Sequence, residues 1–342
     1  MPSRKQLITE LGEKKLIKRL LKKSQTILFN NSFYDEKTLQ SLSDDAALLN
    51  LGNKYLVATT DLLLRSAHFP GEMSYHQMGN KIVTVNVSDL AAMGAKPLGI
   101  TIAMALPPDL SISDFDQIVE GILQTCKKYE MPLIGGDTNE SSELTLCGTG
   151  MGLVNKEKVL LKSGAQEGDV VAVTGVLGLA AAGFEILSNE SDFKNLDPEM
   201  KNQFIKHALE PEAQLEKGLI LAGSPGVTSA TDITDGLLSE LGEIMDSNRA
   251  NTGIKLFEEL IPIPTEFNSI AEKLGKTVLE LVLTYGEDFE LLITVQKDKY
   301  EALENEIGLH KIGYVTSSGL IHMVNKEGKT KLLTPKGYEH FK

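Results

Sequence analysis

The chain has 342 residues, of which 42% are hydrophobic and 24% charged, and its formal net charge is -13. This length predicts two globular domains, and the acidic balance argues against a nucleic-acid-binding surface, which needs clustered Lys and Arg. The two cysteines, Cys126 and Cys147, have no second Cys or His at ligand spacing, so we expect neither a disulfide framework nor a Cys-based zinc site.

Residues 1–25 predict an amphipathic helical extension, because Leu and Ile recur there at helical spacing among Lys and Glu. The segment lacks the apolar centre of a signal peptide. No apolar run elsewhere reaches the roughly 18 residues of a membrane span. We therefore expect a soluble, cytoplasmic protein with neither a membrane nor a nucleic acid as partner.

Two strands joined by a short turn come next, with carboxylates near both of their outer ends. Asp44 and Asp45 precede the first strand. The second strand, predicted over residues 56–60, is apolar enough to be buried and leads directly into Asp61.

Residues 78–93 predict a helix that is apolar nearly all round, and therefore buried, and that ends before Pro97. Asp89 lies on this helix, where an ionised carboxylate costs several kcal/mol unless a positive group lies against it. No basic residue stands three or four positions away. Two interpretations remain: a carboxylate hydrogen-bonded to backbone at a helix end, or a ligand of a divalent cation, which the recurrence of similar Asp-bearing stretches favours.

Between residues 99 and 154 the pattern predicts a strand, a helix capped by Ser113, and two further strands. The first of these two strands ends in Gly135-Gly136-Asp137-Thr138. The second carries a glycine at every second position from Gly148 to Gly152. Bare backbone on one face predicts close approach by another sheet or subunit, with a phosphate cradle as the alternative.

A stretch rich in Lys, Glu and Gly, residues 155–168, predicts the boundary between domains 26–155 and 165–342. A second α/β pattern follows it, interrupted by an expected polar loop over residues 189–202.

The segment Thr231 to Gly236 precedes another amphipathic helix. Thr234 or Asp235 would either cap that helix or serve a site, whereas Asp232 lies ahead of the cap and is not explained by capping.

Carboxylates next to Gly, Thr or Ser thus recur at strand ends and turns: Asp44, Asp45, Asp61, Asp89, Asp137, Asp232, Asp235, Glu287 and Asp288. If folding gathers them, their mutual repulsion requires bound cations. Oxygen ligands without His or Cys indicate Mg²⁺ shared with substrate phosphates. The segment Gly275-Lys276-Thr277 imitates the end of a P-loop but lacks its first Gly and a preceding strand, so an Asp-rich ATP site of another kind is expected.

Six motifs in this order resemble those of the thiamine-monophosphate kinase family: Asp44-Asp45-Ala46-Ala47, Thr59-Thr60-Asp61 with His68-Phe69, Asn86 to Gly94, Gly135 to Thr138, Asp232 to Leu237, and Gly286 to Leu292. The resemblance runs from about Thr26 to Phe341. It implies a two-domain α/β (α+β) fold of the aminoimidazole ribonucleotide synthase type, with a C-terminal α/β domain. It also implies a homodimer whose N-terminal sheets form a joint barrel, and ATP-dependent phosphorylation of thiamine monophosphate to thiamine diphosphate.

The same resemblance implies roles for individual residues. The Mg²⁺ ligands would be Asp45, Thr59, Thr60, Asp61, Asp89, Asp137, Asp232 and Asp235. The ATP contacts would be Gly136, Asp137, Lys162 and Thr234. The thiamine monophosphate contacts would be His68, Glu287 and Tyr338. No residue is expected to act as an acid or base, because the substrate phosphate is already ionised near neutral pH and attacks the γ-phosphorus of ATP directly.

The sequence departs from the family pattern at four places. Lys162 stands where many bacterial members have Arg, Thr234 replaces Ser, Arg65-Ser66 replaces Glu-Gly, and Tyr285 replaces Gly. Lys162 keeps the positive charge but loses the bidentate fork of Arg. Two alternatives remain open: another ATP-dependent enzyme of the superfamily, such as aminoimidazole ribonucleotide synthase, or a non-catalytic, metal-stabilised dimerisation module.

Overall fold

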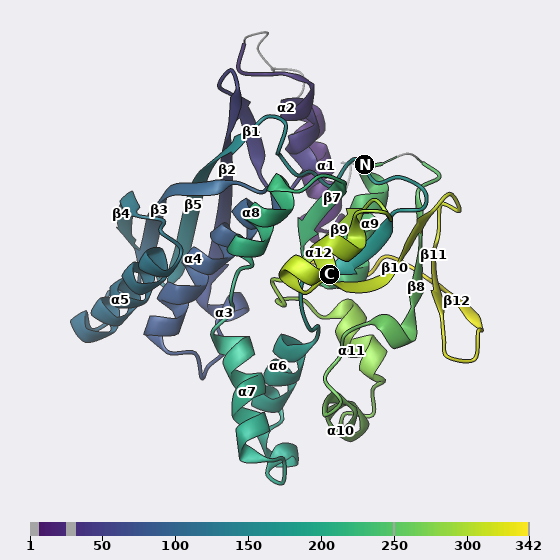
Figure 1. Cartoon of the computed structure of the whole chain (residues 1–342). Coiled ribbons are helices and arrows are strands. Elements are labelled where there is room, and N and C mark those ends of the chain that lie inside the picture. Colours follow the sequence, from purple (N-terminus) through teal and green to yellow (C-terminus); the bar gives the residue numbers. More distant parts are fainter. Residues whose placement is uncertain (1–6, 25–31, 249, 341–342) are drawn as a thin grey trace, which may run out of the picture.

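The computed structural model of the chain describes residues 7–24, 32–248 and 250–340. Figure 1 shows two β-sheets side by side, with helices around and between them. The α-helices described are α1 (Glu13–Ser24), α2 (Glu36–Gln40), α3 (Arg65–His68), α4 (Tyr75–Ala92), α5 (Ile112–Lys128), α6 (Leu179–Ser188), α7 (Pro198–Leu209), α8 (Leu215–Gly223), α9 (Leu237–Asp246), α10 (Phe267–Lys273), α11 (Val278–Thr284) and α12 (Tyr300–Ile307). The 3₁₀ helices described are η1 (Ile8–Glu10), η3 (Ser41–Ser43), η4 (Glu190–Phe193) and η5 (Glu258–Leu260).

The first sheet has the strand order β1-β2-β5-β3-β4. Its strands are β1 (Ala47–Asn50), β2 (Lys54–Leu64), β3 (Lys96–Leu106), β4 (Leu133–Glu140) and β5 (Thr145–Asn155). Strands β3 and β4 are parallel and the other pairs antiparallel. The predicted hairpin is confirmed: β1 and β2 are joined by a turn in which Gly52 adopts a φ of +88°.

The second sheet has the strand order β12-β11-β8-β10-β6-β9-β7. Its strands are β6 (Val170–Val173), β7 (Val227–Asp232), β8 (Gly253–Phe257), β9 (Leu291–Val295), β10 (His310–Thr316), β11 (Ile321–Val324) and β12 (Thr330–Leu333). Only β8 and β11 pair in parallel among the described strands of this sheet. The central strands β6 and β9 are buried along their whole length, as their continuous apolar sequences require.

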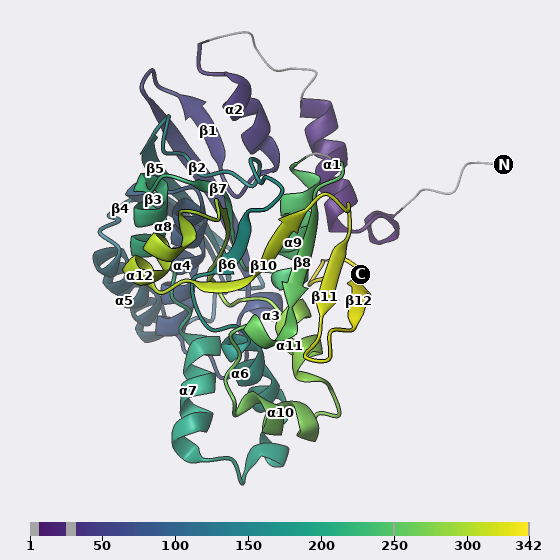
Figure 2. The same ribbon diagram turned by 45° about the vertical axis from the view of Figure 1, so that its right-hand side comes forward.

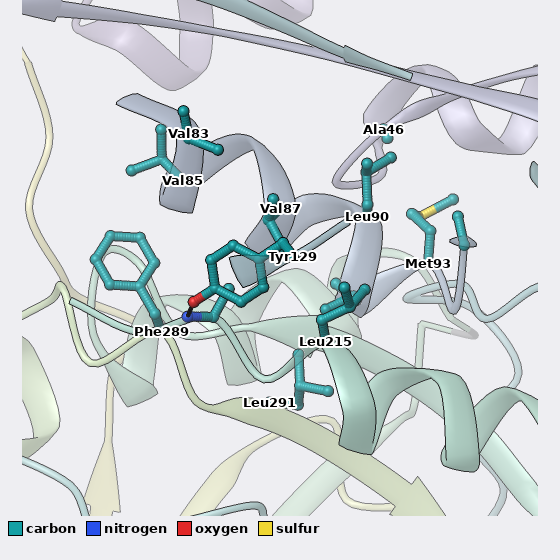
Figure 3. Close-up of a cluster of buried hydrophobic side chains, with 14 of the residues drawn as sticks. Ala46, Val83, Val85, Val87, Leu90, Met93, Tyr129, Leu215, Phe289 and Leu291 are labelled. Atoms are coloured by element: carbon teal, nitrogen blue, oxygen red, sulfur yellow. Dashed lines mark hydrogen bonds between the residues drawn. The ribbon is translucent and has the colours of Figure 1, made fainter. Parts of the chain in front are cut away.

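Helix α4 is buried because it packs against β2 and β5 on one side and against α8 and β7 on the other. Val87 and Leu90 are completely inaccessible to solvent. Figure 3 shows these side chains in one cluster with Phe289 and Leu291 of the second half of the chain. The buried helix predicted from the sequence is therefore confirmed, and it lies between the two sheets.

Helix α1 lies beside α9 (Figure 2), and the C-terminal segment contacts α1. Lys14 Nζ is 3.0 Å from Ser239 Oγ and 3.3 Å from Glu243 Oε1. The backbone N–H of His340 donates to Glu13 Oε2 at 3.0 Å. The predicted N-terminal helix is thus present, and residues 1–6 and 25 lie outside the described residues.

Three local predictions are wrong. Ser111, and not Ser113, caps α5, because its side chain accepts a hydrogen bond from the N–H of Asp114. The expected polar loop 189–202 contains η4 and the first residues of α7. The neighbour of the glycine-bearing face of β5 is α4, since a Cβ on Gly148 would lie 2.5 Å from the Asn86 side chain.

No helix within the described ranges combines the length and the hydrophobicity that crossing a lipid bilayer requires. Both cysteines are free thiols, and Cys126 of α5 is buried in the core.

The contact between α4 and α5 depends on a glycine and yields a stability prediction. A Cβ on Gly121 would lie 2.0 Å from the carbonyl oxygen of His76, whereas a Cβ on Gly223 of α8 would meet nothing within 4 Å. We expect Gly121→Ala to cost roughly 1–3 kcal/mol of unfolding free energy, because overpacking forces the helices apart. The same change at Gly223 should be neutral or stabilise by up to about 1 kcal/mol. Denaturant titrations of both variants measure this, and equal midpoints would contradict the close approach.

Candidate active site

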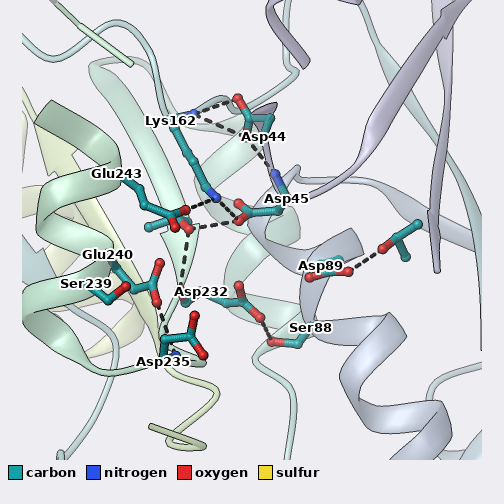
Figure 4. A network of polar contacts seen from close by, with 12 residues as sticks. Asp44, Asp45, Ser88, Asp89, Lys162, Asp232, Asp235, Ser239, Glu240 and Glu243 are labelled. Carbon is teal, nitrogen blue, oxygen red and sulfur yellow. Dashed lines mark hydrogen bonds and ion pairs between the residues drawn. The ribbon is translucent and has the colours of Figure 1, made fainter. Parts of the chain in front are cut away.

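Three aspartates from distant parts of the sequence meet at α4 (Figure 4). Asp45 precedes β1, Asp89 lies in the last turns of α4, and Asp232 is the last residue of β7. Ser88 Oγ donates to Asp232 Oδ2 at 2.5 Å, which ties α4 to the second sheet. The side chain of Asp89 accepts a hydrogen bond from the hydroxyl of Thr59 on β2. The partner of Asp89 is therefore a side-chain hydroxyl and not the backbone at a helix end.

Lys162 is the cation among these aspartates. Its side chain is only 7% exposed, and its Nζ lies 2.8 Å from Asp45 Oδ1 and 2.6 Å from Glu243 Oε2. Its backbone N–H donates to the Asp44 carboxylate. Burial lowers the pKa of Lys162, but the carboxylates of Asp45, Glu243 and Glu240 outweigh it and raise that pKa well above its usual value, so Lys162 stays charged.

The single ammonium of Lys162 does not neutralise all the carboxylates around it, and several of them have raised pKa values. Burial and the Asp45 carboxylate raise the pKa of Asp232 to about 8 and that of Asp44 to about 7. Burial raises the pKa of Asp61, on β2, to about 6. Burial and the neighbouring acids, Asp61 first, raise the pKa of Asp89 well above its usual value. We call Asp44, Asp45, Asp61, Asp89, Asp232 and Lys162 the acidic cluster.

The acidic cluster has free oxygen ligands for a hard cation. Asp45 Oδ2 and Asp61 Oδ2 are buried and find no hydrogen-bond partner in the part of the chain that the structure describes. In the same described ranges, no three His, Cys, Asp or Glu side chains gather closely enough to hold an ion by themselves. These facts fit Mg²⁺, which commonly takes one or two carboxylates and completes its shell with water and substrate phosphates.

The start of α9 leaves two predicted site residues uninvolved in capping. The N-cap is Gly236, at a φ of +114°, and no side chain caps the helix there. Thr234 and Asp235 are therefore not helix caps. Burial raises the pKa of Asp235 to about 6, and its N–H donates to Glu240 Oε1 at 3.1 Å.

Sequence reasoning missed Glu240 and Glu243 as members of this site. They lie three residues apart on α9, so one face of that helix carries two acids among its leucines. This pair of acids is the sequence feature that could have predicted their place in the site. Asp288, in contrast, accepts the backbone N–H of Gly178 at the start of α6 and caps that helix. It lies outside the acidic cluster.

The three predicted substrate residues form a second group. Lys81 Nζ donates to both carboxylate oxygens of Glu287, at 2.8 and 2.7 Å, and to the carbonyl oxygen of His68 at 2.8 Å. The His68 ring lies 5.4 Å from that of His340, which in turn lies 4.9 Å from the Tyr338 ring. We call these five residues the aromatic group. Lys81 and His340 were not predicted from the sequence.

The C-terminal segment docks on the rest of the protein up to His340, and residues 341–342 lie outside the described residues. The N–H of Tyr338 donates to the carbonyl oxygen of Asp235 at 3.0 Å, while the Tyr338 side chain is 53% exposed. The aromatic group therefore adjoins the loop that precedes α9.

The remaining predicted residues lie elsewhere in the single chain. The Thr60 hydroxyl contacts Thr149, on the sheet face opposite to Thr59. Asp137 is exposed on β4, where its carboxylate accepts from Asn139 at 3.1 Å. β4 lies three strands from β2 in the sheet order, which corresponds to about 14 Å at the usual strand spacing. The chain by itself does not bring Gly136 and Asp137 to the acidic cluster.

Gly136 and Asp137 instead line a cavity of about 380 Å³ between the β3–β4 edge and α5. Its other walls are mostly apolar side chains: Ile102, Met104, Val119, Ile122 and Leu133. A Cβ on Gly136 would lie 2.0 Å from the carbonyl oxygen of Ile102, so only glycine fits against β3 at this position.

The chain is similar to known proteins in both sequence and structure. Models of the AIR synthase related protein N-terminal and C-terminal domains match residues 43–154 and 166–324. The thiamine-monophosphate kinase of Pyrococcus abyssi is 34% identical over 301 residues, which cover 88% of this chain and 90% of that protein. The chain belongs to the thiamine-monophosphate kinase family. The family resemblance and the two-domain fold predicted from the six motifs are thereby confirmed.

Two further relatives support the family membership. The Haemophilus influenzae thiamine-monophosphate kinase is 33% identical, with 97% of this chain and 98% of that protein covered. The solved structure of AaThiL complexed with AMPPCP and TMP superposes with a TM-score of 0.84 at 28% identity, covering 99% of this chain and 100% of that chain.

The raised carboxylate pKa values predict how stability depends on pH without metal. The folded-state pKa of Asp61, about 6, exceeds its ordinary value of 3.8, so the native state binds the extra proton between these values. The stabilisation from this proton is present at low pH and is lost as the pH rises through about 6. We therefore expect Asp61→Asn to raise the melting temperature of metal-free protein at pH 8 and to change it little at pH 4.

The measurement is a pair of melting curves at each pH. Asp298→Asn is the control, because the Asp298 side chain is 72% exposed and its one ion pair within the described residues is with the adjacent Lys299. An Asp61→Asn variant that is less stable than wild type at pH 8 would contradict the claim that the buried Asp61 carboxylate destabilises the metal-free protein.

Proposed function

We propose that this protein phosphorylates thiamine monophosphate to thiamine diphosphate with ATP. The observation that carries the proposal is that α4 joins two groups of opposite character: the acidic cluster, suited to cations and phosphates, and the aromatic group, suited to a heterocycle. The similarity to AaThiL complexed with AMPPCP, an ATP analogue, and TMP supports it, as do the thiamine-monophosphate kinases at about a third identity.

In the reaction, an oxygen of the thiamine monophosphate phosphate attacks the γ-phosphorus of ATP, and the bond from that phosphorus to the β–γ bridging oxygen breaks to release ADP. The attacking phosphate is already ionised, so no general base is required. The residues of the chain act by positioning and charge. Lys162 and Thr234 contact the ATP phosphates, while His68, Glu287 and Tyr338 orient thiamine monophosphate.

Mg²⁺ is the proposed cofactor. Asp45, Thr59, Asp61, Asp89 and Asp232 would supply ligands for one or more ions, whose shells water and substrate phosphates would complete, and Asp235 would bind a further ion. When bound, Mg²⁺ neutralises the two polyanions and the carboxylates around Lys162. The buried orphan oxygens of Asp45 and Asp61 support this assignment.

We further propose a homodimer whose N-terminal sheets close into a joint barrel. Within the described residues, β1 pairs with β2 only from Tyr55 to Ala58, so the rest of that edge of β2 has no partner strand. The whole outer edge of β4 is likewise unpaired and exposed. Leu62 and Leu98 are 54% and 46% exposed, so the sheet carries apolar side chains for a partner to cover.

Within one chain, Asp137 lies far from the acidic cluster. Pairing of β4 with the free half of the partner's β2 would bring Asp137 to the partner's acidic cluster. Asp61 lies in that free half of β2, so the partner's Asp137 would approach Asp61 and the acidic cluster. The cavity beside Gly136 would then take the adenine base and direct the phosphates across the interface. We retain the domain division 26–155 and 165–342 with a 1–25 extension, Thr60 as a further metal ligand, and a cytoplasmic location as proposals.

The activity test is thiamine diphosphate formation from thiamine monophosphate, ATP and Mg²⁺. We expect Asp89→Asn to lower turnover by roughly a hundredfold or more, because it removes a proposed Mg²⁺ ligand and with it part of the positive charge that offsets the transferring phosphate. The surface control Asp298→Asn should retain wild-type turnover. Wild-type protein that instead turns over ATP with formylglycinamidine ribonucleotide would support aminoimidazole ribonucleotide synthase, and Asp89→Asn with more than about half the wild-type rate would refute the metal role.

A subunit-mixing experiment tests the shared site. If each site takes Asp89 from one subunit and Asp137 from the other, then Asp89→Asn and Asp137→Asn proteins are each inactive alone. Mixed dimers have one intact site, so unfolding and refolding an equal mixture should restore about a quarter of wild-type activity. Measured activity that stays at the level of the separate variants would show that both residues serve the same subunit's site.

A further inference from the structure

Lys81 is a charged residue in the buried helix α4. Its side chain is 1% exposed, among the least exposed of the large side chains described. A buried ammonium costs free energy unless acceptors surround it. Lys81 has such acceptors in the Glu287 carboxylate and the His68 carbonyl, and the Phe184 ring lies 5.9 Å from its Nζ.

The Glu287 loop is held in an unusual backbone conformation. Glu287 has a φ of +67°, which is rare and strained for a residue with a side chain. Its N–H donates to the carbonyl oxygen of Thr234 at 2.8 Å, and a Cβ on Gly286 would lie 1.8 Å from that same oxygen. The backbone of the loop is thus fixed against the Asp232–Gly236 segment, and Lys81 fixes the side chain from the opposite side.

Lys81 also sets the surroundings of His68. The His68 Nδ1 accepts the N–H of Leu64 at 3.0 Å, so in the neutral ring the proton resides on Nε2. Burial and the Lys81 ammonium hold the pKa of His68 below its usual value, which favours that neutral form. The same ammonium therefore acts on both residues: it binds the Glu287 carboxylate and the His68 carbonyl oxygen, and it favours the neutral His68 ring.

The helix places this arrangement at a fixed distance from the acidic cluster. Lys81 and Ser88 lie seven residues apart, which puts them on the same face of α4 about 10 Å apart along its axis. Lys81 contacts Glu287 and Ser88 contacts Asp232, so both contacts cross to the second half of the chain. One rigid element thus spaces the aromatic group from the phosphate end of the site.

We propose that Lys81 is a positioning residue for the aromatic end of the substrate: it holds the Glu287 carboxylate and the His68 backbone in place without touching the substrate. The inference rests on the proposed function and deepens it. Lys81 acts through Glu287, so removing either partner disturbs the same recognition of the heterocycle and leaves ATP binding intact.

The test compares Lys81→Met, Glu287→Gln and the double variant. We expect Lys81→Met to raise the KM for thiamine monophosphate about tenfold to a hundredfold, because the Glu287 carboxylate loses its buried counter-ion. The KM for ATP should stay within about twofold of wild type. The double variant should have a KM close to that of Glu287→Gln, since most of the effect of Lys81 passes through that carboxylate and only the contact with the His68 carbonyl remains.

Lys128→Met is the control for losing a lysine that forms an ion pair. Lys128, at the end of α5, lies 2.8 Å from Glu212 and, like Lys81, connects the first half of the chain to the second. The KM values of Lys128→Met should equal those of wild type. The inference would be overturned if the KM for thiamine monophosphate in the double variant rose by the product of the two single-variant increases. It would also be overturned if Lys81→Met raised the KM for ATP as much as the KM for thiamine monophosphate. If Lys81→Met does not fold, the double variant decides, because it carries no orphaned buried carboxylate.

Wild-type protein is assayed first, so that the two hypotheses fail separately. No thiamine diphosphate from wild type would reject the proposed function and the inference with it. Normal wild-type activity with an unchanged thiamine monophosphate KM in Lys81→Met would reject the role of Lys81 alone.

Discussion

The burial of α4 between the two sheets is the constraint on which the site depends. A helix enclosed on nearly all sides must be apolar, and each polar group that it retains must find a partner in its surroundings. Lys81 and Ser88 find theirs in Glu287 and Asp232, about 200 and 144 positions away in the chain. The helix therefore aligns the two halves of the protein through a shared core and two polar contacts.

Repulsion among the buried carboxylates of the acidic cluster destabilises the protein as long as no substrate or cation is bound. Burial raises the pKa of Asp232 and Asp89, and Lys162 offsets only part of the repulsion among the carboxylates. Such a site is complementary to cations carried with polyphosphates, so the free energy released by neutralising it is available for binding. A surface group of acids in water would give much weaker discrimination.

Much of this architecture could be predicted from the sequence. The apolar stretch around Asp89 predicts the buried helix, and the order of the six motifs predicts the family. Strand register and contacts between residues far apart in the chain could not be predicted. Which face of β4 carries Asp137 depends on strand register, and a one-residue shift reverses it. Lys81 looks like a single polar interruption until Glu287 is placed beside it, and the neighbour of Gly148 is known only once α4 lies on β5.

The meeting of α1 with the last described residues has a practical consequence for handling the protein. Glu13 and Lys14 contact His340 and α9, so α1 and the last described residues lie against the loop that carries Asp235. Insertions or labels within α1 or at residues 338–340 would disturb this contact and the loop beside it. The β11–β12 hairpin offers a better attachment point, because Gly328 at its turn lies in open space and far along the sheet order from β7.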